Sequence, residues 1–175
     1  MISSKNNSKS LWSLLLTILA LLFLTALQIS FFNPAFFGLN IFLILALILV
    51  LAKHNKSALF IGWISGLLLD TARFSNFGEN SLVFLITILA LIIIFKTAFF
   101  TLKTENIIFM ALLTVFLYHL LDWVVLNSFA LLKLGGFENF GYHFIQWNFP
   151  IEIITTVILT LLIFKYFNFY NEQKI

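Results

Sequence analysis

The 175-residue chain contains no cysteine, only two prolines, and few charged residues. The absence of cysteine excludes disulfides, thiolate metal sites and a cysteine nucleophile. Histidine pairs at His-x3-His spacing and glycine-rich phosphate loops with their lysine are also missing. Charged residues make up 10% of the chain, against roughly 25% in an average soluble domain. We therefore expect neither a metal nor another cofactor, and we do not expect an enzyme.

The dominant property of the sequence is hydrophobicity. Apolar residues account for 62% of the chain and its mean hydropathy is +1.07. Long apolar runs recur and polar residues are confined to short gaps, so no length remains for a soluble domain of about 100 residues. The net charge is +3, but the lysines stand singly or in pairs between apolar runs. This pattern indicates a single integral membrane domain in contact with lipid, and no nucleic-acid partner.

Six apolar runs predict an all-α bundle of six transmembrane helices. Residues 1–10 are expected to form a disordered cytoplasmic leader, and residues 168–175 a cytoplasmic tail. The first run has 22 residues, which is too long for a signal-peptide core, so we expect it to remain uncleaved. The third and fourth runs have 14 and 15 residues and reach only about 21 to 23 Å of a core about 30 Å thick. The expected spans are residues 11–32, 35–52, 57–70, 81–95, 107–126 and 149–167.

The distribution of basic residues predicts the orientation of these spans. With both termini in the cytoplasm, eight of the ten basic residues lie inside, and only Arg73 and Lys133 lie outside. A re-entrant hairpin over residues 57–95 is the alternative for the two short spans. It would hold Arg73 at membrane depth, at a cost of about 2.5 to 3.5 kcal/mol. Two full crossings, extended by flanking polar residues, are therefore favoured.

Polar residues within the spans indicate which helix faces point into the bundle. They recur at steps of four on the fifth span and again on the sixth, where Glu152, Thr156 and Thr160 follow one another. Asp70, Asp122 and Glu152 all fall near the outer surface. One interpretation is an outward-facing polar pocket, with His143 of the outer loop as a further candidate; the other is interhelical hydrogen bonding and helix-end carboxylates that reach water. The pocket candidates are Gln28, Tyr118, His119, Asp122 and Glu152.

Gly62 and Gly66 form a small-x3-small pair on the third span, the spacing that lets two helix backbones approach closely. Ser65 extends the smooth face. We expect close packing here, against either another helix of this chain or another protein.

The stretch that follows this glycine pair resembles a bacterial family, the rod shape-determining protein MreD. The similar features are "GLLLD" ending at Asp70, a glycine eight residues later at Gly78, and the step from Asn80 to Leu82. "LQIS" at the end of the first span and Pro34 before the second also resemble the family. The chain departs from the usual turn in having Phe74 and Asn76 where glycine and proline are typical.

The resemblance implies a helical bundle similar to the S-components of energy-coupling-factor vitamin transporters. It also implies a non-catalytic scaffold of the cell-elongation machinery in the bacterial inner membrane, which binds MreC and helps couple MreB to the wall-synthesis enzymes. Asp70, Arg73, Gly78 and Asn80 are then the candidate outer turn for a partner. The alternative is a genuine S-component that captures a vitamin. S-components present an Ala-x3-Ala pair on the first helix, whereas Ala20 and Ala26 are six residues apart.

Overall fold

The computed structural model describes residues 40–73, 78–98, 103–132 and 148–172, with Gly136 and six positions between residues 20 and 27. Within these residues the protein is entirely helical, which confirms the expected all-α class. Gln28, most of the first expected span and the leader lie outside the described residues. The main helices are α2 (Ile41–Leu51), α3 (Asn55–Arg73), α4 (Glu79–Ala98), α5 (Thr104–Leu131) and α7 (Asn148–Glu172).

Three of the described helices contain stretches long and apolar enough to cross a membrane: Glu79–Thr97, Thr104–Leu131 and Phe149–Tyr166. The fourth apolar run has 15 residues, and α4 has 20 because it continues into the polar residues at both ends. In the same way α3 has 19 residues, against 14 expected. Helix α2 is apolar but has only 11 residues. The complete six-span topology stays a prediction.

The turn between α2 and α3 is tight because α2 ends in a Schellman motif. The N–H of His54 donates to the carbonyl of Leu49 at 2.9 Å, and the N–H of Lys53 donates to that of Val50 at 3.0 Å. Lys53 adopts a positive φ of 62°, a position usually taken by glycine. At the other end of α2, the side chain of Asn40 accepts the N–H of Leu43 at 3.2 Å and starts the helix.

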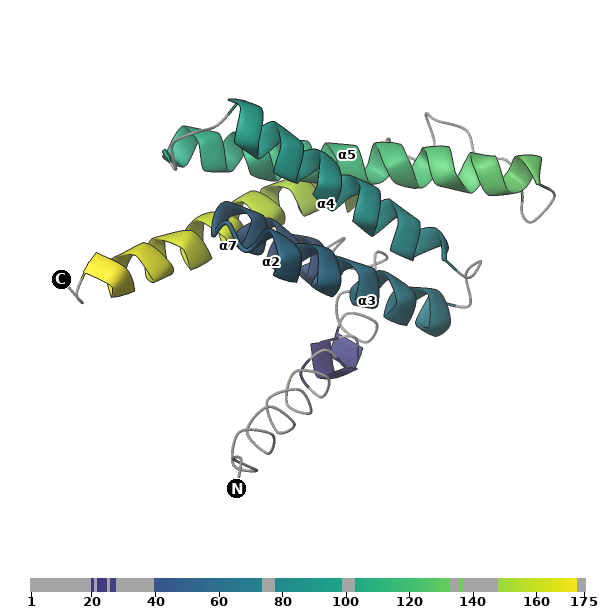
Figure 1. Ribbon diagram of the computed structural model, residues 1–175, viewed down its shortest axis with the longest axis horizontal. Coiled ribbons are helices and arrows are strands. Elements are labelled where there is room, and N and C mark those ends of the chain that lie inside the picture. Colours follow the sequence, from purple (N-terminus) through teal and green to yellow (C-terminus); the bar gives the residue numbers. More distant parts are fainter. Residues whose placement is uncertain are drawn as a thin grey trace, which may run out of the picture.

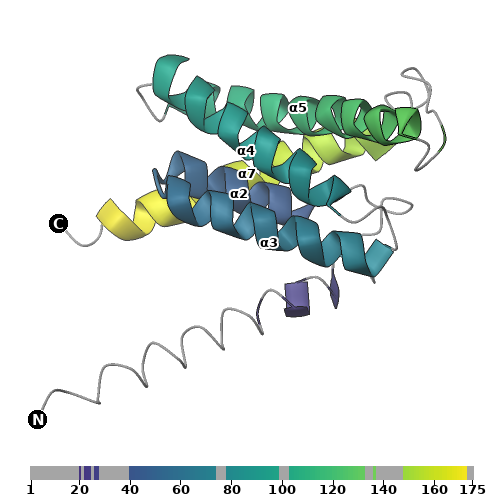
Figure 2. The same ribbon diagram turned by 45° about the vertical axis from the view of Figure 1, so that its right-hand side comes forward.

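Helices α3 and α4 form an antiparallel hairpin with a close backbone contact (Figures 1 and 2). A Cβ at Gly66 would lie 2.4 Å from the Cα of Ser81 and 2.7 Å from its backbone nitrogen. A Cβ at Gly62 would meet the flexible end of the Ile88 side chain. The glycine pair therefore packs against a helix of its own chain, which resolves the alternative left open by the sequence.

Helix α2 contacts all four of the other main helices and α5 packs against α7, while α4 contacts α2, α3 and α5. The inward face of α4 carries Val83, Phe84, Ile88 and Leu91, all with 0% exposure. Large apolar side chains such as Phe109, Phe116 and Ile154 are exposed on the outside, as expected for surface that faces lipid.

The two ends of the bundle carry opposite charge. Figures 1 and 2 show the α2–α3 turn, the end of α4, the start of α5 and the end of α7 at the same end of the bundle. The lysines of the described helices and turns are found there: Lys53, Lys56, Lys96, Lys103 and Lys165. The opposite end holds Asp70, Glu79, Asp122 and Glu152. Glu105 and Glu172 at the basic end and Arg73 at the acidic end are exceptions. This segregation agrees with the predicted orientation, in which the basic end is cytoplasmic.

The hairpin contact predicts different costs for two glycine substitutions. Gly66→Ala places a methyl group against the backbone of Ser81, which cannot move without shifting α4, so we expect destabilisation by about 1 to 3 kcal/mol. Gly62→Ala is the matched control, because only the end of a flexible isoleucine side chain must give way. Thermal unfolding in detergent measures both. Equal tolerance of the two substitutions would contradict the close contact at Gly66.

Candidate functional site

The carboxylate of Asp70 caps the start of the following helix. Its Oδ2 accepts the backbone N–H of Gly78 at 2.9 Å. Its Oδ1 accepts the backbone N–H of Asn80 at 2.8 Å and the side-chain amide of Asn80 at 2.9 Å. The first N–H groups of a helix have no partner within that helix, and they carry partial positive charge. Asp70 therefore satisfies donors at the N-terminus of α4 from a position in α3, just before the turn.

The backbone conformation explains the glycine in this turn. Gly78 has a φ of +93°, which L side chains rarely adopt, while a Cβ there would meet nothing within 4 Å. Conformation, and not space, therefore favours glycine at this position.

Asp70 is 2% exposed and Asn80 is 6% exposed, so the two side chains face each other inside the hairpin. The interpretation of Asp70 as a carboxylate that reaches outer water is therefore wrong. That interpretation failed because the sequence does not reveal that the N–H donors at the start of α4 lie beside Asp70. Arg73 ends α3, but its side chain lies outside the described set, as do residues 74–77. Contact between this turn and a partner stays a prediction.

A second polar contact joins α5 to α7 at the same end of the bundle. His119 Nε2 lies 2.6 Å from Glu152 Oε2, close enough for the two groups to share a proton. The side chains of His119 and Glu152 are 18% and 6% exposed. The pair therefore crosses a largely buried helix interface, where breaking one side leaves a buried polar group unsatisfied.

Aromatic rings connect this pair to α4. The ring of Phe84 contacts that of Tyr118 at 5.3 Å between centroids, and Tyr118 contacts His119 at 5.5 Å. On the other side, His119 contacts Phe149 at 5.2 Å. All three contacts are edge-on, the geometry that aromatic pairs prefer. The four rings link α4, α5 and α7 at the acidic end, which is also the end where Asp70 caps α4.

The structure thus brings together three of the five candidate pocket residues, Tyr118, His119 and Glu152. Asp122 lies one turn further along α5 and is half-buried. Gln28 and His143 are outside the described ranges. Sequence reasoning missed Phe84 and Phe149, because nothing distinguishes them among 23 phenylalanines.

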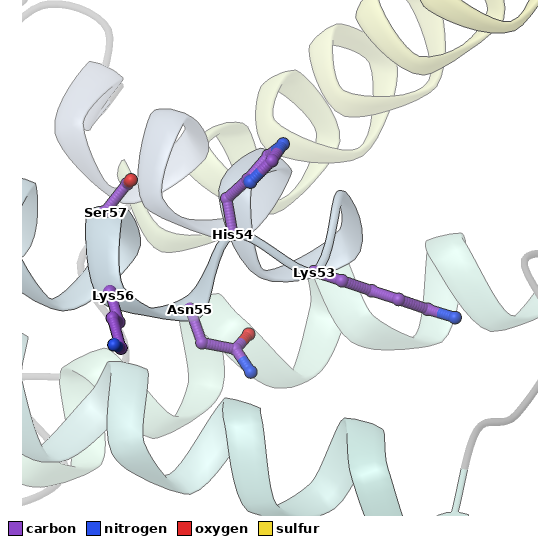
Figure 3. Close-up of a pocket in the computed structure, with 5 residues that line it drawn as sticks. All are labelled: Lys53, His54, Asn55, Lys56 and Ser57. Atoms are coloured by element: carbon purple, nitrogen blue, oxygen red, sulfur yellow. The ribbon is translucent and has the colours of Figure 1, made fainter.

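A hollow of about 360 Å³ lies at the basic end, lined by residues of the α2–α3 turn. Figure 3 shows that Lys53 and Lys56 extend away from each other and that the ring of His54 points in a third direction. The side chains therefore do not converge on one ligand. Among the residues described, no group of three His, Asp or Glu residues is placed to hold a metal.

These features define a membrane protein that is helical throughout the described residues and in which buried carboxylates bond helices to one another at one end of the bundle. The family model of the rod shape-determining protein MreD matches residues 7–171 of the 175-residue chain. The chain therefore belongs to the MreD family and has a role in rod-shape determination. No curated protein and no solved structure matches the chain.

The cap geometry predicts that Asp70→Ala destabilises the hairpin by at least about 2 kcal/mol. The substitution removes the charged acceptor and leaves the N–H groups of Gly78 and Asn80 without that partner. Asp70→Asn should cost less, since its side-chain oxygen can still accept from Asn80. Thr71→Ala is the control, because Thr71 is the next residue of α3 and its side chain is exposed. Thermal unfolding in detergent measures the series; an Asp70→Ala protein as stable as the Thr71→Ala protein would refute the cap.

The contact between α5 and α7 predicts energetic coupling between His119 and Glu152. In a double-mutant cycle with alanine at both positions, we expect a coupling energy of about 0.5 to 3 kcal/mol. The control cycle pairs Glu152 with His54, which lies exposed at the basic end and should show no coupling. Additive effects of the His119 and Glu152 substitutions on stability would contradict the contact.

Proposed function

We propose that this chain is a non-catalytic scaffold of the bacterial cell-elongation machinery. In this role it binds MreC and helps couple MreB filaments to peptidoglycan synthesis. The observation that carries the proposal is the match to the MreD family over residues 7–171, which leaves no part of the membrane domain to another family.

The contacts of the described polar groups support a structural role for these groups and not a catalytic one. Asp70 bonds to the start of α4, and Glu152 bonds to His119 of α5. Both carboxylates thus fix neighbouring helices in place. A scaffold needs such rigidity, because a partner that binds a preformed surface loses less free energy to ordering that surface.

The charge distribution supports a location in the inner membrane with the basic end in the cytoplasm. The lysines at one end of the described bundle would face the cytoplasm, and the α3–α4 turn would face the periplasm. We place the MreC contact at this acidic, periplasmic end, where Asp70 fixes the start of α4.

The alternative of a vitamin-binding S-component gains no support from the same groups. A polar pocket that captures a small molecule needs side chains that converge on a free space. His119 and Glu152 instead bond to each other, and the rings of Tyr118 and Phe149 pack against His119.

We expect purified protein to co-elute with MreC in detergent and to show no thermal shift with a panel of vitamins. At equal abundance in the membrane, Asp70→Ala should recover less MreC, because the edge at the start of α4 is no longer fixed. Thr71→Ala, next to it and exposed, should recover the wild-type amount. Tight binding of a vitamin without recovery of MreC would contradict the scaffold and favour the transporter component.

A further inference from the structure

The threonines of the bundle divide into two groups by where their hydroxyls point. In membrane helices a threonine hydroxyl commonly donates to a carbonyl one turn earlier on its own helix. Thr87 donates to Val83 at 2.7 Å, and Thr114 donates to Met110 at 2.6 Å. The same local bond satisfies three other threonines: Thr71, Thr97 and Thr155.

Two threonines of α7 depart from this rule. The hydroxyls of Thr156 and Thr160 are buried and make no hydrogen bond within the part of the chain that the structure describes, although a carbonyl lies one turn before each of them. Thr156 is 1% exposed and Thr160 is 0% exposed. Thr155, the neighbour of Thr156 on the same helix, does make the local bond. The helix therefore permits that bond, and the two buried hydroxyls are turned away from it.

Both hydroxyls lie on the face of α7 that carries Glu152, since the three residues are spaced by four. Helices α5 and α7 run in opposite directions, so the His119–Glu152 contact sets the register between them (Figure 1). Moving inward from His119, the corresponding positions of α5 are Val115 and Ala111, both buried. Neither offers a side-chain hydrogen bond to the threonine hydroxyls.

A hydroxyl in an apolar interior without a partner costs on the order of 1 to 3 kcal/mol. Two such groups in one stripe require an occupant that can hydrogen-bond, and their burial limits its size to that of water. Buried water commonly bridges polar groups that the protein itself leaves unsatisfied. We propose that ordered water molecules bind the hydroxyls of Thr156 and Thr160 inside the bundle and extend inward from the His119–Glu152 pair.

In this arrangement, one face of α7 lines a narrow hydrated path. Each step of four residues advances about 6 Å along the helix, so the stripe from Glu152 to Thr160 spans about 12 Å. Water at Thr156 would place a hydrogen-bonding neighbour next to the buried carboxylate of Glu152. The path would then connect the polar end of the bundle with its apolar middle.

Water-edited solid-state NMR tests this on the full-length protein in lipid bilayers, with ¹³C-labelled threonine. We expect magnetisation from water to reach Thr156 and Thr160 several-fold faster than it reaches Thr87 and Thr114, which are equally buried but bonded to their own helix. Exposed Thr71 serves as the positive control. Transfer to Thr156 and Thr160 as slow as to Thr87 would overturn the proposal.

Substitution by valine, which has nearly the same shape, gives a second readout. If water is bound, Thr156→Val and Thr160→Val remove a bonded partner, and the unfolding temperature in detergent should fall. If the hydroxyls are dry, the same changes remove an unsatisfied polar group and the unfolding temperature should rise, which would contradict the proposal. Thr114→Val controls for the change of side chain at a buried, locally bonded position.

Discussion

Two oxygen atoms of Asp70 receive three N–H groups from Gly78 and Asn80 at the start of α4, and the arrangement of the hairpin follows from this contact. Donors at a helix start cannot be left unsatisfied near the apolar region of a membrane. A carboxylate held by the preceding helix satisfies them without a long loop. It also fixes the distance between the two helices at the turn, which brings Gly66 against the backbone of Ser81.

The packing of the rest of the described bundle builds on α4. Because its start is fixed, α4 presents Phe84 to Tyr118 of α5, and α5 in turn presents His119 to Glu152 of α7. Each link joins one helix to the next at the acidic end. Three residues that looked like candidates for a ligand pocket, Tyr118, His119 and Glu152, thus form contacts that join α4, α5 and α7.

Much of this architecture could be predicted from the sequence because membranes impose simple rules. Hydrophobic runs predicted the helices, and the lysines predicted which helix ends lie together. The spacing of Gly62 and Gly66 predicted a close contact, although not its partner. The role of Asp70 could not be read from composition, since a carboxylate at a helix end has the same local sequence whether it meets water or the next helix. Only the fold places Asn80 beside it.

Hydropathy alone does not give the ends of the helices, for a related reason. Hydropathy marks the part of a helix that lies in lipid, whereas hydrogen bonds at the caps decide where a helix begins and ends. Glu79 and Asn80 are polar, yet they belong to α4 and are buried. Asn40 likewise caps α2, whose first residue, Ile41, lies six residues after the start of the apolar run at residue 35.

Hydrogen exchange of backbone amides tests the central contact most directly. The N–H groups of Gly78 and Asn80 lie at the edge of a turn, where exchange is ordinarily fast. If Asp70 caps α4, both amides of the wild-type protein exchange slowly, at rates similar to amides in the middle of α4. Exchange as fast as that of an open turn would show that the carboxylate does not hold the start of the helix.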